Sequence, residues 1–102
     1  MDAAIGAVWK KNLPTVRDRL ALLQTAADDL ARSRTIDDDE RAEALSIAHK
    51  FAGSLGMFGM HEATEIARAM EQNLEQDGLP QPERLQDQVA ALHALLAPHL
   101  ND

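Results

Sequence analysis

The chain has 102 residues and no cysteine, so it has the length of one domain and forms no disulfide. Its formal net charge is −7, from 17 acidic and 10 basic residues, which argues against nucleic acid and anionic membranes as partners. No apolar run approaches the roughly 18 residues of a membrane span, and the N-terminus lacks the apolar segment of a signal peptide. The absence of both favours a cytoplasmic location.

Two helical segments are expected in the first third of the chain. A short helix is predicted from Asp2, which suits an N-cap, to about Asn12. Pro14 interrupts the pattern, and proline is tolerated in the first turn of a new helix. A second helix is therefore expected from Pro14 to about Arg34, with an apolar residue recurring at helical spacing. The residues of this stripe are Val16, Leu20, Leu23, Ala27 and Leu30.

Three further helices follow, and no segment alternates like a strand. The acidic stretch Thr35 to Glu40 suits a helix start, so the next helix is expected from about Asp38 to Gly56. Two more are predicted, from His61 to about Gln76 and from about Glu83 to Ala97. The whole chain, residues 1–102, is thus expected to be one all-α domain. Its predicted architecture is an antiparallel up-down-up-down four-helix bundle with a short additional N-terminal helix.

The stretch "AHKFAGSLGMFG", residues 48–59, holds three glycines where helix is expected. Glycine in a helix interior costs about 0.5–1 kcal/mol relative to alanine. On a helical wheel of about 100° per residue, the residues within roughly 60° of His49 are all small. These residues are Ala42, Ser46, Gly53 and Gly56. His49 is therefore expected to be exposed, with a bare backbone beside it that lets another protein approach the imidazole.

Plainer interpretations of the same pattern stay open. Gly56 could simply cap the end of the helix, and Gly53 could permit a close contact between helices. An exposed histidine is also most often only a solvated side chain.

Three residues flank the face of His49 on the helical wheel. Leu45 and Ala52 lie on the flank between the face of His49 and the core stripe, and Lys50 projects from the other flank.

Residues 48–71, "AHKFAGSLGMFGMHEATEIARAME", resemble the signature of histidine phosphotransfer (HPt) domains. That signature has a histidine, a hydrophobic residue two positions after it, a glycine four positions after it and a further small residue seven positions after it. A Ser or Ala follows the first glycine, and a hydrophobic residue and a glycine close the pattern. The matching residues here are His49, Phe51, Gly53, Ser54, Gly56, Phe58 and Gly59. The specific match covers about a quarter of the chain.

The resemblance implies a phosphorelay intermediate rather than a conventional enzyme. His49 would take a phosphoryl group from the aspartate of a response-regulator receiver domain, or from a sensor histidine kinase, and pass it to another receiver. The receiver would bring the Mg²⁺, so no cofactor or metal is expected on this chain. The chain itself is expected to be a monomer. Docking and support of the site would fall to Leu45, Ser46, Lys50, Ala52, Gly53 and Gly56, with Met57 at the apolar rim.

One departure from the family and two alternatives remain. Many members carry a lysine three positions after the histidine, whereas this chain has Ala52 there, and whether Lys50 replaces that lysine stays open. A non-phosphorylated helical adaptor that docks a receiver or another signalling protein is the alternative function.

The segment "HEATE", from His61, has part of the zinc-protease H-E-x-x-H pattern, but Glu65 replaces the second histidine. Acidic residues in a first helical turn explain this segment better.

Overall fold

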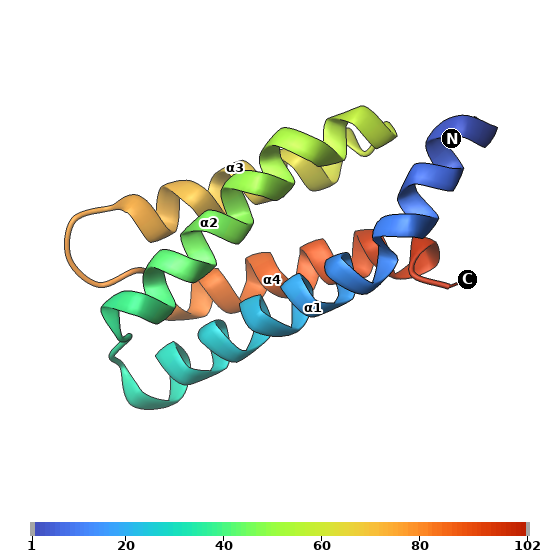
Figure 1. Cartoon of the computed structure of the whole chain (residues 1–102). Helices are drawn as coiled ribbons and strands as arrows, with labels where there is room; N and C mark the ends of the chain where they lie inside the picture. Colours follow the sequence, from blue (N-terminus) through green and yellow to red (C-terminus); the bar gives the residue numbers. More distant parts are fainter. Residues whose placement is uncertain (1, 102) are drawn as a thin grey trace.

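The computed structural model describes residues 2–101, and within them it contains helices and no strand. The four main helices are α1 (Ala3–Ser33), α2 (Asp38–Ser54), α3 (His61–Glu75) and α4 (Pro82–Leu96). Consecutive helices run antiparallel, and contacts join α1 to α2 and α4, and α3 to α2 and α4 (Figure 1). The prediction of an all-α four-helix bundle is confirmed. No helix in the described chain is both long and apolar enough to cross a bilayer.

The N-terminal part of the bundle differs from the prediction. Ala3–Ser33 forms one helix of 31 residues that contains Pro14, so the expected separate helix ending near Asn12 is wrong. Trp9 and Leu13, on the N-terminal side of the proline, are buried in the same core as the rest of α1. This burial offsets the cost of about 3 kcal/mol that proline imposes within a helix. Figure 1 shows the accompanying bend in the blue N-terminal part of α1.

The other helix boundaries follow local chemistry. The Asp2 carboxylate accepts a hydrogen bond from the Ile5 amide at 2.9 Å, so the predicted cap is confirmed. Asp37 caps α2, and three acidic residues in the first turn complement the helix dipole. Helix α2 ends at Ser54 rather than Gly56, because the chain tightens into the 3₁₀ helix η1 (Leu55–Phe58).

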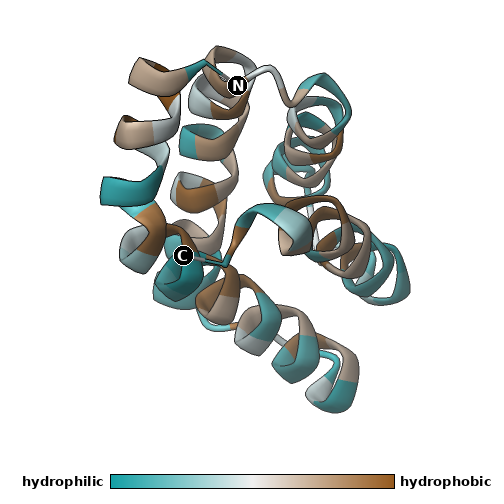
Figure 2. Ribbon diagram, turned by 90° about the vertical axis from the view of Figure 1, so that its right-hand side faces the viewer, coloured by the Kyte–Doolittle hydropathy of each residue, from teal (hydrophilic) through white to brown (hydrophobic). Residues whose placement is uncertain are grey.

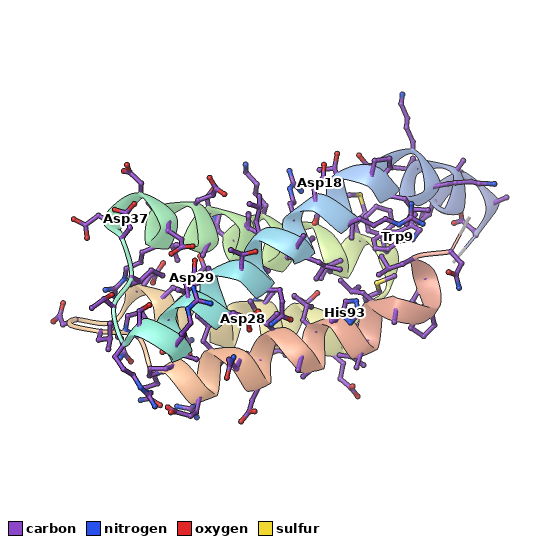
Figure 3. All side chains as sticks on the ribbon, turned by 90° about the horizontal axis from the view of Figure 1, so that it is seen from below. Trp9, Asp18, Asp28, Asp29, Asp37 and His93 are labelled. Carbon is purple, nitrogen blue, oxygen red and sulfur yellow. The ribbon has the colours of Figure 1, made fainter. Side chains whose placement is uncertain are left out.

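All four helices contribute one apolar face to a single core. Figure 2 shows the resulting alternation of hydrophobic and hydrophilic residues along each helix. At one end of the bundle the Trp9 ring packs edge-on against Phe58, with centroids 4.9 Å apart. Its Nε1 donates to the His99 carbonyl at 2.7 Å, which ties α1 to the short helix η2 (Ala97–His99). Asp29 and Asp37 lie towards the opposite end (Figure 3).

Arg41 joins the beginning of α2 to the end of α3. Its guanidinium donates to the carbonyls of Leu74, Gln76 and Gly78 at 2.8, 2.6 and 2.7 Å. The last carbonyls of a helix have no partner within the helix and carry its negative dipole end. The Leu74 carbonyl is one of these, and the other two acceptors lie in the segment that follows α3, so Arg41 stabilises the end of α3 and holds it against α2.

Candidate functional site

His49 lies on the outer face of α2, with 75% of its side chain exposed. Its neighbours Ala48 and Phe51 point to the other side of the helix and are buried. The prediction that His49 is exposed is confirmed, because the apolar stripe of α2 leaves the histidine no place in the core.

The side chains around His49 are small. Ala42, Ser46 and Gly53 are exposed, and Gly56 is half-buried. The flanking residues Leu45 and Ala52 are half-buried and pack against the core, while Lys50 and Met57 are exposed. The imidazole therefore projects beyond the small residues that surround it, and the partly exposed apolar side chains of Leu45 and Ala52 lie beside them.

The three glycines have different structural reasons. A Cβ atom at Gly53 would meet no neighbouring atom within 4 Å, so this glycine does not serve a close contact between helices. A Cβ at Gly56 would lie 3.7 Å from the Thr64 hydroxyl, an ordinary contact. Gly59, with φ of 77°, is the residue in the left-handed conformation that ends η1, so the interpretation of Gly56 as the cap is wrong. Nothing within the described fold requires a glycine at position 53.

Glu71 of α3 is the direct partner of His49. The His49 Nδ1 atom lies 2.6 Å from the Glu71 Oε2 atom, and the carboxylate side chain is only 20% exposed. A carboxylate only accepts hydrogen bonds, so the neutral ring carries its proton on Nδ1. Its Nε2 atom then presents an unprotonated lone pair on an exposed ring. The sequence alone does not point to Glu71, because no spacing rule pairs residues 22 positions apart on two helices.

His49 borders an open hollow of about 440 Å³ between α2 and α3. Helix α2 contributes small residues beside the histidine, and α3 contributes charged and amide side chains. The lining consists of His49, Ala52, Gly53, Arg68, Glu71, Gln72 and Glu75. Lys50 is not part of this lining. The hollow is in the size range of small-ligand sites, about 300–1,000 Å³, so it has room for a phosphoryl group and for atoms of a partner.

Within residues 2–101, no three histidine, cysteine or acidic side chains converge as they would around a metal ion. The residues of the "HEATE" segment open α3 instead, with Glu62 in its first turn. An acidic side chain at that position is favourable beside the positive end of the helix dipole.

Comparison with known proteins gives a family match. Residues 8–97 match the family model described as Hpt domain. A stretch of 69 residues is 31% identical to Protein RcaC of Microchaete diplosiphon, and it covers 68% of this chain and 10% of that protein. The chain thus corresponds to about a tenth of the length of this relative. No solved structure matches the chain. The family match confirms the resemblance carried by residues 48–71.

Proposed function

The chain belongs to the Hpt domain family, whose members are phosphotransfer modules that work with receivers and kinases in phosphorelays, and we propose that His49 is its phosphoacceptor. In this proposal residues 1–102 form one domain that receives the phosphoryl group from a receiver aspartate or a histidine kinase. It then passes the group to another receiver. The observation that carries the proposal is the exposed imidazole whose Nδ1 is held by Glu71.

The transfer step follows from this geometry. The Nε2 lone pair attacks phosphorus, and the N–P bond forms while the P–O bond to the donor aspartate breaks. The electron pair of that bond leaves with the aspartate carboxylate. The Nδ1 proton stays between the ring and Glu71, so no proton has to be moved. The phosphorylated ring is cationic, and the neighbouring carboxylate stabilises that charge. Transfer to the next receiver is the reverse of this step.

The small residues around His49 suit the approach of a receiver. A receiver must bring its aspartyl phosphate and Mg²⁺ within bonding distance of Nε2. The exposed backbone at Gly53, the short side chain of Ser46 and the absence of a side chain at Gly56 leave space for its loops. Leu45 and Ala52 offer partly exposed apolar surface beside the site. Lys50, exposed on the other flank, would meet the partner only at the edge of the interface.

The test is phosphoryl transfer from a phosphorylated receiver, or from its kinase, to the chain and to His49→Gln. His61→Gln and His93→Gln are matched controls, since both histidines are exposed on other surfaces. We expect an acid-labile, base-stable label on the wild type and both controls, and none on His49→Gln. The unfolding free energy of His49→Gln should change by about 0.5 kcal/mol or less, because the side chain is exposed.

Two results would contradict the proposal. A label that persists on His49→Gln would mean that another residue accepts the phosphoryl group. A wild type that stays unlabelled with several donors, yet binds a receiver, would support the adaptor function instead.

A further inference from the structure

The hollow beside His49 contains one cationic side chain. A phosphoryl group brings close to two negative charges at neutral pH, and two carboxylates, Glu71 and Glu75, already line the hollow. Ala52, which also lines the hollow, is uncharged and cannot neutralise a phosphoryl group. Among the described lining residues only Arg68 carries a permanent positive charge, and it comes from α3 rather than from the helix of His49.

We infer that Arg68 binds the phosphoryl group on His49 and takes the charge-neutralising role that no residue of α2 fills. The inference rests on the proposed function and adds a residue to it. The guanidinium would donate N–H groups to the non-bridging phosphoryl oxygens during and after the transfer step described above. It gives up no proton and forms no covalent bond.

The present partner of Arg68 does not prevent this role. Its Nη1 atom lies 2.9 Å from the Glu65 Oε1 atom on the same helix. Both side chains are largely exposed, and such pairs contribute only about 0–1 kcal/mol. An arginine–phosphoryl contact with two parallel hydrogen bonds is stronger, so the guanidinium can leave Glu65 when His49 is phosphorylated.

Gln72 supports the same site. It lies four residues after Arg68 on α3 and lines the same hollow. Residues four apart on a helix are neighbours on its surface, so the amide NH₂ of Gln72 and the guanidinium face one space. The amide would donate a further hydrogen bond to the phosphoryl oxygens without adding charge.

The experiment measures the pKa of the phosphoryl group by ³¹P NMR titration of the receiver-phosphorylated full chain. A nearby cation favours the dianion, so Arg68→Ala should raise the phosphoryl pKa by about 0.5–1 unit, a modest shift because the site is exposed. Arg68→Gln, which keeps most of the side-chain length, should do the same, and transfer should slow about tenfold in both. Arg84→Ala is the matched control and should leave the titration unchanged, because Arg84 is exposed on α4 and does not line the hollow.

A rescue variant separates charge from structure. Ala52 lines the hollow from α2, so Ala52→Lys in the Arg68→Ala background places an ammonium there and should return the phosphoryl pKa to its wild-type value. An unchanged phosphoryl pKa in a labelled Arg68→Ala protein would overturn the inference, even if transfer were slower, because Arg68 would then act only in docking. A wild type without label on His49 would instead overturn the proposed function, and the inference with it.

Discussion

Replacing Gly53 by alanine should stabilise this protein. The residue lies within α2, and a Cβ there meets nothing within 4 Å. Alanine is favoured over glycine in a helix interior by about 0.5–1 kcal/mol, and a position one residue from the helix end gains the lower value. In a domain of 60–100 residues, 1 kcal/mol corresponds to about 4–8 °C in Tm. Gly53→Ala should therefore raise Tm by about 2–4 °C, as measured by thermal unfolding.

Gly59→Ala is the control of opposite sign. A Cβ at Gly59 also meets nothing within 4 Å, but its φ of +77° lies in the left-handed region. A side chain there costs about 1–2 kcal/mol, so Tm should fall by roughly 4–16 °C. Since both sites have open space, the contrast isolates the backbone conformation. A lower Tm for Gly53→Ala would refute the reasoning, because it would require a close contact that the structure does not contain.

A larger substitution at Gly53 tests whether a phosphorylated receiver approaches His49 over this residue. Gly53→Leu places a bulky side chain at the rim of the hollow, at an exposed position where a Cβ meets nothing within 4 Å, so we expect the protein to fold normally. Transfer from a phosphorylated receiver should nevertheless fall at least tenfold, which corresponds to about 1.4 kcal/mol. Gly6→Leu is the matched control, because Gly6 also has open space and does not line the hollow. Normal transfer by Gly53→Leu would show that donors do not approach over this glycine.

Three further substitutions test other contacts. Glu71→Gln keeps the shape of the partner of His49 but removes its charge, so transfer should slow about tenfold, and ¹⁵N NMR should show less of the Nδ1-protonated tautomer. Arg41→Ala removes three hydrogen bonds to the end of α3 and the segment after it, and it should lower the free energy of urea unfolding by about 2–3 kcal/mol, which Arg41→Lys recovers only in part. Burial, followed by a hydrogen bond to Asp29 and nearby carboxylates, raises the pKa of Glu40 above its ordinary value of 4.5. Its contribution to stability is therefore full below the ordinary pKa and is lost as pH rises through the raised pKa, so Glu40→Gln should raise Tm at pH 7 and change it little below pH 4.5.

Features with a local cause could be predicted from the sequence. The acidic caps at Asp2 and Asp37 act on amides within their own first turns, so the helix starts could be placed from residue type alone. The exposure of His49 followed from the apolar period of a single helix. Pro14 predicts a break, whereas the structure continues the helix through it, because the burial of Trp9 beyond the proline offsets its local cost.

Contacts between helices could not be predicted in the same way. Periodicity assigns a residue to a face, but it does not give the axial register of one helix against another. The partner of Glu71 lies 22 positions away, on α2. The partners of Arg41 lie at the end of α3 and in the segment after it, the nearest of them 33 positions away. The roles of Glu71 and Arg41 therefore cannot be predicted from spacing, whereas His49 is marked by the family signature within its own helix.

The residues of the site come from two helices, α2 and α3, so its geometry depends on the axial register between them. Helix α2 carries His49, the proposed phosphoacceptor, and the small residues beside it, and α3 carries the charged side chains Arg68, Glu71 and Glu75 that line the hollow with His49. A shift of α3 by one helical turn, about 5.4 Å, would separate Glu71 from the Nδ1 atom that it now contacts at 2.6 Å. Arg41 opposes such a shift at one end of the pair, where it binds the last carbonyls of α3. We therefore expect the site to function without a lysine at position 52, because the inferred role of Arg68 supplies positive charge from α3. Arg68 and Ala52 line the same hollow, and this requires that the register of α2 and α3 is kept.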